Sequence, residues 1–191
     1  MRIISGKLRG RKFTLPSGKW PVRPTTDFAK EGLFNVLVHQ FDIEEMHILE
    51  LFGGTGNFSF EFVSRGCRNV TYVDKFYPCV KFVKATAESW NISDEINAIR
   101  MDAFQYIAKA SGSFDIIVAD PPYDMPRLGQ LPALVKQSSL LKEGGWFILE
   151  HNQTNQFEQH EDCFMVKNYG KTYFSYFLFE KDEKVDGIKI V

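Results

Sequence analysis

Short apolar runs alternate with amphipathic stretches along the chain from residue 47 onward. The apolar runs have the length of buried strands, and the stretches between them carry apolar residues at helical spacing. This alternation needs crossover connections, so it predicts a doubly wound α/β sheet with mostly parallel strands. The expected strands are residues 47–52, 69–74, 96–101, 114–119 and 146–150, and the expected helices are residues 57–65, 78–90, 103–109 and 131–141.

The two ends of the chain depart from this alternation. Residues 163–170 and 171–180 are strand-like runs joined by a turn too tight for a crossover, which predicts an antiparallel hairpin and a seven-stranded sheet. Before the sheet, a helix is expected from residue 27, with Thr25 or Thr26 as its N-cap. We therefore predict a basic N-terminal arm, residues 1–25, followed by one domain, residues 26–191.

Charge is distributed unevenly along the chain. Residues 1–30 carry eight Lys and Arg and one Asp, a net charge of +7, so the other 161 residues carry −8 of the total of −1. Glycines and prolines keep the first 25 residues from forming an ordinary amphipathic helix. A solvated charged surface is one interpretation, but a basic segment on an acidic body favours a nucleic acid partner. The predicted RNA-binding residues are Lys7, Arg9, Arg11, Lys12 and Arg23.

Several protein classes do not fit this composition. No apolar run reaches the roughly 18 residues of a membrane-spanning helix, and the N-terminus lacks the apolar centre of a signal peptide, so we expect a soluble, cytoplasmic protein. The three cysteines are far apart and form no C-x-x-C pair, which argues against disulfides and zinc. The four histidines lack ligand spacing, and we predict no metal site.

Acidic residues follow four consecutive predicted strands. Glu50, Asp74, Asp102 and Asp120 each stand at the carboxyl end of a strand, which is the edge where open parallel sheets bind ligands. One such acid is often only a helix cap or turn former, but the regular placement of four predicts a binding site. Gly54 and Gly56 after the first strand allow a backbone to approach a ligand closely.

Two cofactor classes fit this edge of the sheet. Asp74 lies 18 residues after Gly56, where an acid accepts hydrogen bonds from ribose, so a nicotinamide dinucleotide is one candidate. The dinucleotide fingerprint lacks its third glycine, because Ser59 stands there. A carboxylate at Glu50 suits a cation better than a pyrophosphate. We therefore favour S-adenosylmethionine, which has a ribose and an adenine but carries an ammonium and a sulfonium.

The stretch Asp120-Pro121-Pro122-Tyr123 ends a buried strand at a rigid corner. Neither proline can donate to a neighbouring strand, and Pro121 forces an extended Asp120. The exocyclic amine of a nucleobase is a poor nucleophile, and acceptors fixed on its hydrogens turn its lone pair out of the ring plane. The Asp120 side chain and the Pro121 carbonyl are predicted to be these acceptors, and the Tyr123 ring is predicted to stack on the base. A packing loop is the alternative.

With these residues in view, the chain resembles the class I S-adenosylmethionine-dependent methyltransferases. It is most similar to the bacterial 16S ribosomal RNA (guanine(966)-N2)-methyltransferases, through MRIISGKLRGRKF, RPTTDFAKEGLFNVL, ELFGGTG, YVDK, DPPY, GGWFILEH and YGKTYFSYF in that order. The chain departs from that family at Glu50, where Asp is usual, and at Gly53 and Gly32, where Ala is common.

This resemblance implies roles for individual residues. It assigns Glu50, Phe52, Gly54 and Gly56 to the methionine end of the cofactor, Asp74 and Lys75 to the ribose, Asp102, Ala103 and Phe104 to the adenine, and Asp120 to Tyr123 to the target amine. It also implies methyl transfer to the N2 of a guanine in 16S ribosomal RNA, with naked RNA or an assembling small subunit as partner.

Three other functions stay open at this point. Similar motifs serve protein glutamine N5-methyltransferases, although those usually have Asn at the position of Asp120 and a helical N-terminal domain. DNA adenine methylation generally needs a separate recognition domain, for which 191 residues leave no room. A non-catalytic RNA-binding protein with the same fold is the third alternative, and the intact DPPY corner speaks against it.

Overall fold

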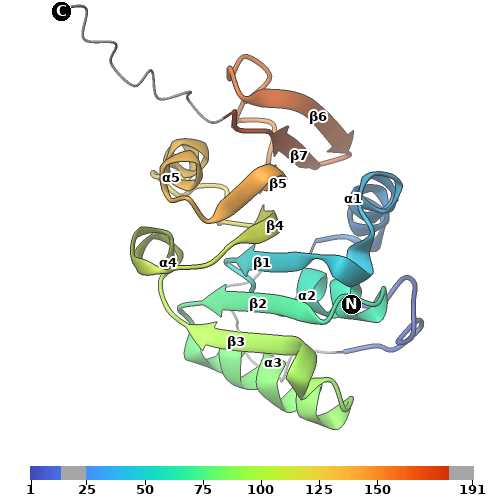
Figure 1. Ribbon diagram of the computed structural model, residues 1–191. Coiled ribbons are helices and arrows are strands. Elements are labelled where there is room, and N and C mark those ends of the chain that lie inside the picture. Colours follow the sequence, from blue (N-terminus) through green and yellow to red (C-terminus); the bar gives the residue numbers. More distant parts are fainter. Residues whose placement is uncertain (14–24, 181–191) are drawn as a thin grey trace, which may run out of the picture.

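The computed structural model describes residues 1–13 and 25–180, which form an α/β domain around one seven-stranded sheet (Figure 1). The strand order is β3-β2-β1-β4-β5-β7-β6, in which β7 runs antiparallel to both of its neighbours and the other pairings are parallel. The strands are β1 His47–Leu51, β2 Asn69–Asp74, β3 Ile96–Arg100, β4 Phe114–Ala119, β5 Leu141–His151, β6 Cys163–Tyr169 and β7 Thr172–Phe177.

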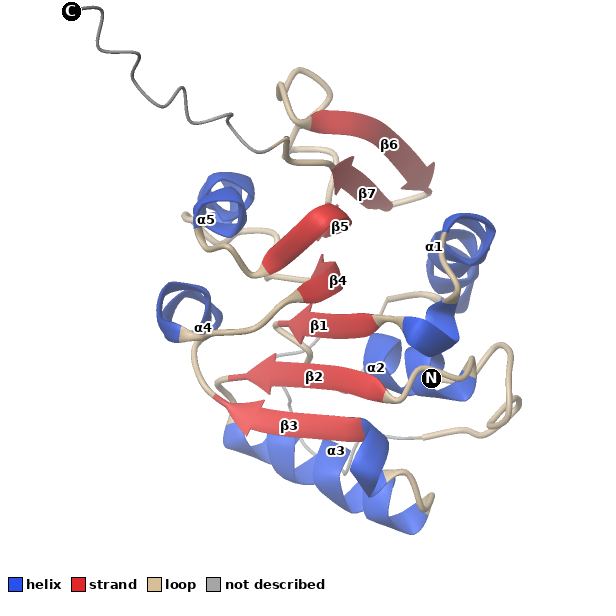
Figure 2. Cartoon of the chain, viewed as in Figure 1, coloured by secondary structure: helices blue, strands red, loops and turns tan. Residues whose placement is uncertain are grey.

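Helices cover both faces of the sheet (Figure 2). The α-helices are α1 Asp27–Gln40, α2 Asn57–Ser64, α3 Tyr77–Ser89, α4 Ala103–Lys109 and α5 Leu131–Gln137, and the short 3-10 turns are η1 Ile43–Glu45, η2 Ser93–Glu95 and η3 Leu128–Gln130. Two apolar cores result, one under α1, α2 and α3 and one under α4 and α5. Successive residues of one strand serve both, as Ile48 and Leu49 do, which explains the continuous apolar runs of the sequence.

The strand order places a topological switch point beside β1. From β1 the chain proceeds to β2 on one side and later returns to β4 on the other, and Leu51 is in register with both Val73 and Ala119. The segments that follow these strands therefore leave the sheet at one edge and diverge. Such a crevice is where doubly wound sheets bind ligands, and the predicted fold class is confirmed.

The last predicted helix is shorter than expected. Residues 131–141 were predicted as helical, but α5 ends at Gln137, and β5 already begins at Leu141. The Ser138 hydroxyl donates to the Val135 carbonyl at 2.8 Å, and Ser139 has a positive φ of 57°, which ends the helix. Gly144 lies within β5 with a φ of 75°, where the register with β4 shifts.

The first 13 residues pack against the domain. Ile3, Leu8 and Phe13 are buried in the same core as α1 and α2. The backbone N–H groups of Ile4 and Ser5 donate to the Glu61 carboxylate at 2.8 and 3.1 Å. This segment is thus held at a fixed place on α2. The predicted boundary between the arm and the domain is at residue 25. Residues 14–24, which include Lys19 and Arg23, lie outside the described residues.

One of the eight basic residues counted near the N-terminus is internal. The Lys30 side chain is fully buried, donates to the Arg2 carbonyl at 2.7 Å and pairs with Glu61 at 3.3 Å. Burial lowers its pKa, and the Glu61 carboxylate opposes that shift. Lys30 therefore fastens α1 to α2 and is not available to an external polyanion. Within the described residues, no helix combines the length and the apolar character needed to cross a membrane.

Candidate active site

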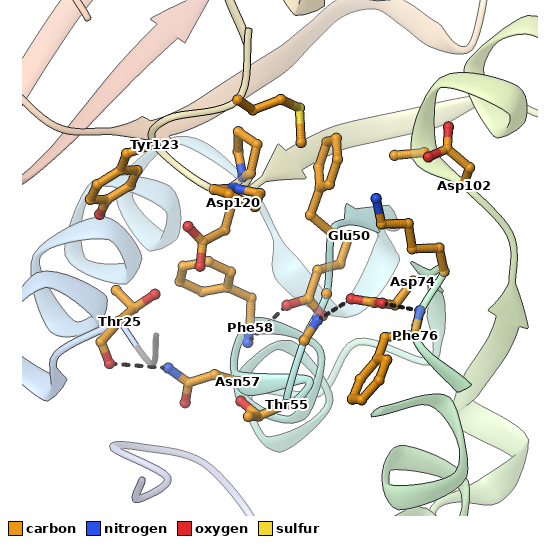
Figure 3. Close-up of a pocket in the computed structure, with 18 residues that line it drawn as sticks. Thr25, Glu50, Thr55, Asn57, Phe58, Asp74, Phe76, Asp102, Asp120 and Tyr123 are labelled. Carbon is orange, nitrogen blue, oxygen red and sulfur yellow. Dashed lines mark hydrogen bonds between the residues drawn. The ribbon is translucent and has the colours of Figure 1, made fainter. Parts of the chain in front are cut away.

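A cavity of about 410 Å³ lies at the carboxyl ends of the strands (Figure 3). Eleven of the thirteen predicted catalytic and cofactor-binding residues line it. Gly56 and Phe104 are not among the lining residues, although both adjoin them in the chain. The lining residues are Thr25, Glu50, Phe52, Gly53, Gly54, Thr55, Asn57, Phe58, Asp74, Lys75, Phe76, Asp102, Ala103, Asp120, Pro121, Pro122, Tyr123 and Met125.

Glu50 faces the beginning of α2. Its carboxylate accepts the backbone N–H of Phe58 at 3.4 Å and of Ser59 at 3.0 Å, and it also accepts the Ser59 hydroxyl. Glu50 is only 2% exposed, and burial raises its pKa to about 7. The positive end of the α2 dipole and these donors offset part of the cost of a buried negative charge. The Glu50 side chain is one methylene longer than that of Asp, and its carboxylate reaches the backbone N–H groups at the start of α2.

The glycine turn between β1 and α2 is tightly folded. The Gly54 N–H donates to Asp74 at 2.8 Å, and the Gly56 N–H donates to the Gly53 carbonyl at 2.7 Å. Gly56 has a φ of 72° and is the N-cap of α2, so its role in this structure is to shape the turn. A Cβ at Gly53 would overlap the ring of Tyr72, whose hydroxyl donates to the Gly54 carbonyl at 2.7 Å.

Asp74 and Asp102 each have structural partners as well as a place in the cavity wall. Asp74 accepts the Gly54 N–H and, at 2.7 Å, the Phe76 N–H, and burial raises its pKa. Asp102 is the N-cap of α4 and accepts the Phe104 N–H at 3.0 Å. The helix-cap interpretation of a single acid is thus correct for Asp102, yet its side chain still borders the cavity. Through these two hydrogen bonds Asp74 links the loop after β1 to the loop after β2.

Asp120 directly follows β4, where the hydrogen-bond ladder of that strand ends. Its backbone N–H donates to the Leu51 carbonyl at 3.3 Å, after which Pro121 and Pro122 have no N–H to donate. The Pro122 carbonyl accepts the Met125 N–H at 2.9 Å and closes a turn. Figure 3 shows Asp120 and Tyr123 on one side of the cavity and Asp74 and Asp102 on the other. The corner predicted from the prolines is therefore present and borders the cavity.

The Tyr123 hydroxyl is anchored by a residue that sequence reasoning missed. It donates to Glu150 at 2.7 Å, and the Thr25 hydroxyl donates to the other oxygen of the same carboxylate at 2.8 Å. Burial, followed by the Glu150 charge, raises the pKa of Tyr123. Glu150 is 2% exposed and lies near the end of β5. It thus joins the DPPY corner to Thr25, two residues before α1, and it restricts rotation of the Tyr123 ring.

Further lining residues come from segments that carry no motif. Asn57, the first residue of α2, donates to the Thr25 carbonyl at 3.5 Å, and its side-chain oxygen accepts Lys30 at 2.8 Å. Phe58, Phe76 and Met125 add apolar surface to the cavity. The sequence indicates these residues only through their position, because they follow the glycine turn, the end of the second strand and the DPPY corner.

The charges of the cavity fit a cationic ligand. Among the lining residues that the structure describes, four carboxyl groups, those of Glu50, Asp74, Asp102 and Asp120, stand against one ammonium, that of Lys75. A pyrophosphate would be repelled there, whereas an ammonium and a sulfonium would be attracted. The donor and acceptor groups present thus fit S-adenosylmethionine and not a dinucleotide. Across residues 1–13 and 25–180, no group of three or more His, Cys, Asp or Glu is placed to hold a metal ion.

The predicted RNA-binding residues occupy the N-terminal segment on α2 and α3. Lys7 pairs with Glu95 at 2.6 Å, and the Arg11 guanidinium lies over the Trp90 ring at 5.3 Å. Arg9 and Lys12 are exposed, and Arg23 lies outside the described residues. The segment begins next to the cavity, because the Thr55 hydroxyl contacts the Met1 sulfur at 3.0 Å. An RNA role for these residues remains a prediction.

The sheet order, the two helical layers and the acid-lined cavity at the strand ends define a class I methyltransferase, the class that uses S-adenosylmethionine. The solved structure of the Escherichia coli protein yhhF matches with a TM-score of 0.81 at 22% identity, covering 95% of this chain and 99% of that one. The 16S rRNA N2 G1207 methyltransferase of Thermus thermophilus, solved with AdoMet and guanosine, matches with a TM-score of 0.63 at 19% identity, covering 82% and 44%.

The sequence comparisons narrow the class to a family. The family model described as Conserved hypothetical protein 95 matches residues 1–178, and the chain belongs to this family. The Bacillus subtilis protein YlbH is 33% identical over 156 residues, 80% of this chain and 83% of the relative. Ribosomal RNA small subunit methyltransferase D of Buchnera aphidicola is 30% identical over 154 residues, 81% of this chain and 77% of the relative. The resemblance found in the motifs is confirmed.

Proposed function

We propose that this protein transfers a methyl group from S-adenosylmethionine to the exocyclic N2 of a guanine in 16S ribosomal RNA. The observation that carries the proposal is the shared cavity. The rigid Asp120-Pro121-Pro122-Tyr123 corner and the Glu50 and Asp74 carboxylates line the same space. The family relatives named ribosomal RNA small subunit methyltransferase D support RNA as the substrate.

The cofactor half of the cavity would hold S-adenosylmethionine, which supplies an electrophilic methyl group on a sulfonium. In our proposal Glu50 and the Gly54 turn hold the methionine end, Asp74 and Lys75 the ribose, and Asp102 with Ala103 the adenine. Because Glu50 and Asp74 are already fixed by backbone N–H groups, little side-chain entropy is lost on binding.

The substrate half would hold a flipped guanine. The Asp120 carboxylate and the Pro121 carbonyl accept the two hydrogens of the amine, which directs its lone pair toward the methyl carbon. The Tyr123 ring, fixed through Glu150, lies against the face of the base. Alignment of amine and methyl is the main contribution of the protein to the rate. As the nitrogen–carbon bond forms, the carbon–sulfur bond to the methyl group would break, the sulfonium would leave as a neutral thioether, and one proton of the amine would pass to Asp120 or to water.

Binding of the RNA would begin at the exposed basic residues of the N-terminal segment. Arg9 and Lys12 are solvent-exposed on a segment that begins beside the cavity. Contacts of this kind go to phosphates and position the RNA without reading its sequence. We therefore propose that the affinity decreases as the salt concentration rises, and that base selection occurs in the cavity.

Transfer of a labelled methyl group tests this function. The full-length protein is incubated with methyl-labelled S-adenosylmethionine and, separately, with naked 16S ribosomal RNA, assembling small subunits or a peptide-release factor. Label on N2-methylguanine in one of the two RNA samples supports the proposal. Label in the release factor would support the glutamine alternative, and label in none of the samples would support a non-catalytic RNA-binding protein.

A further inference from the structure

An aromatic side chain stands exposed beside the cavity, in the first turn of α1. Phe28 is 67% exposed, which exceeds the 54% of Tyr77 and the 48% of Phe164, the next most exposed large hydrophobic residues of residues 1–13 and 25–180. Thr25, three residues earlier, lines the cavity. Thr26 is the N-cap of α1, and its hydroxyl accepts the Ala29 N–H at 3.2 Å. Phe28 is thus held by a capped helix at the rim of the cavity.

The turn between β6 and β7 reaches the same rim. His151 at the end of β5 is in register with Tyr173 at the start of β7, so this turn lies at the edge of the sheet that carries the cavity. Thr172, the first residue of β7 after this turn, forms a hydrogen bond with the Tyr123 side chain. Figure 1 shows the end of β6 beside α1. The turn therefore lies next to both the DPPY corner and the start of α1, which line the cavity through Tyr123 and Thr25.

The Tyr169 ring packs against the Phe28 ring. The two ring centroids are 5.6 Å apart with an interplanar angle of 81°, an edge-to-face contact. The Tyr169 ring lies directly over Gly32, where any Cβ would overlap it. A glycine inside a helix costs about 1 kcal/mol relative to alanine. At this position it admits the ring that fixes Phe28, which gives the glycine at position 32 a physical reason.

The charges around Phe28 favour a polyanion. Residues 163–172 contain two lysines and no acid, and Lys167 and Lys171 are both exposed. Asp27, next to Phe28 in the chain, is paired with Arg2 at 3.2 Å. Glu31, one helical turn after Phe28, is exposed, so the two lysines outnumber this acid by one charge. A neutral apolar partner would not need these lysines, and an acidic protein would not need the exposed ring, whereas an RNA strand presents a base for the ring and a phosphate for the ammonium.

We propose that Phe28, Tyr169 and Lys171 form a docking surface for the nucleotide adjacent to the flipped target. Phe28 stacks on the neighbouring base, Tyr169 holds the Phe28 ring in place, and Lys171 binds the phosphate between the two nucleotides. The surface keeps the RNA from following its target base into the cavity. It selects an unstacked neighbour, because both faces of a base inside a duplex are covered by the bases above and below it. This inference rests on the proposed RNA methylation and adds a second point of recognition to it.

Steady-state kinetics of two matched variants test the surface. Phe28→Ala removes the ring at the cavity rim, and Phe164→Ala removes an exposed ring at the other end of β6, where it packs on Trp146. The substrate is whichever RNA sample accepts label from the unaltered protein. Base–aromatic stacking contributes about 1–3 kcal/mol, so Phe28→Ala should raise the KM for RNA about 5- to 150-fold. Phe164→Ala should leave it within about twofold.

Three controls separate the possible outcomes. The Kd for S-adenosylmethionine and the Tm of Phe28→Ala should match those of the unaltered protein, and Phe28→Trp should restore the KM because indole also stacks. Lys171→Ala should weaken RNA binding and reduce its salt dependence. An unchanged KM in Phe28→Ala, with methylation intact, would overturn the docking surface and leave the proposed function standing. Absence of RNA methylation by the unaltered protein would instead overturn the proposed function itself.

Discussion

The hydrogen bond from Tyr123 to Glu150 gives a quantitative prediction for stability and for catalysis. Tyr123→Phe removes a hydroxyl that lies 2.7 Å from a buried carboxylate oxygen. Hydrogen bonds to charged groups contribute about 1.5–3 kcal/mol. Tyr123 is only partly buried, so the lower end applies, about 1.5 kcal/mol of unfolding free energy. For a domain of this size the Tm should decrease by about 3–6 °C.

The same bond holds the ring that is proposed to stack on the target base. If positioning of the base depends on it, the loss of about 1.5 kcal/mol appears in the transition state, and kcat decreases about tenfold. The Kd for S-adenosylmethionine should not change, because the cofactor half of the cavity is untouched. Tyr77→Phe, on an exposed ring outside the cavity, is the matched control and should change neither Tm nor kcat.

A double-mutant cycle with Glu150→Ala isolates the pair, because Ala has no acceptor for the Tyr123 hydroxyl. Tyr123→Phe, Glu150→Ala and the double variant are compared by thermal unfolding and by single-turnover methyl transfer. The interaction free energy should be about 1.5 kcal/mol, so Tyr123→Phe should have little further effect once Glu150 is replaced. Additive effects of the two substitutions would refute the reasoning, since they would mean that the two side chains act independently.

Three further predictions concern the rest of the structure. The pKa of Glu50 is raised to about 7, so the free folded protein retains a proton there that the unfolded chain releases. The free energy of unfolding should therefore decrease as pH rises toward 7. Calorimetry should show the affinity for S-adenosylmethionine increasing through pH 7 in the unaltered protein but not in Glu50→Gln. Lys30→Met leaves Glu61 with Arg65 and the N–H groups of Ile4 and Ser5, so the loss should be about 1–3 kcal/mol in urea unfolding and not the larger cost of an unpaired buried charge. No measurable loss would contradict the buried pair. Gly32→Ala should destabilise by about 1–3 kcal/mol through overlap with Tyr169, yet stabilise by about 1 kcal/mol in a Tyr169→Ala background; the same sign in both would contradict the packing.

Features fixed by local chemistry could be predicted from the sequence. The ends of β2 and β4 follow from apolar runs that stop at an acid. The glycine turn after β1 and the double proline after β4 restrict their own backbone conformations. Because the carboxyl ends of parallel strands meet at one edge, residues far apart in the sequence, such as Glu50 and Asp120, could be placed together.

Features that depend on tertiary contact could not be predicted from the sequence. Thr25 and Glu150 are separated by 125 positions, and nothing in either local sequence indicates that they share a hydrogen bond. Lys30 looks like part of a basic surface, and its burial depends on where α1 meets α2. The early start of β5 was missed because its Gly144-Gly145 pair, which usually ends a helix, permits a bulge within a strand instead.

The central claim is that the DPPY corner directs an exocyclic amine toward a methyl group. Mass-spectrometric mapping of 16S ribosomal RNA, methylated in vitro by the unaltered protein and by Asp120→Ala, tests it most directly. We predict N2-methylguanine at a defined position with the unaltered protein. With Asp120→Ala we predict no methylated guanine, although S-adenosylmethionine still binds. Methylation elsewhere than on an exocyclic amine, or full activity of Asp120→Ala, would contradict it.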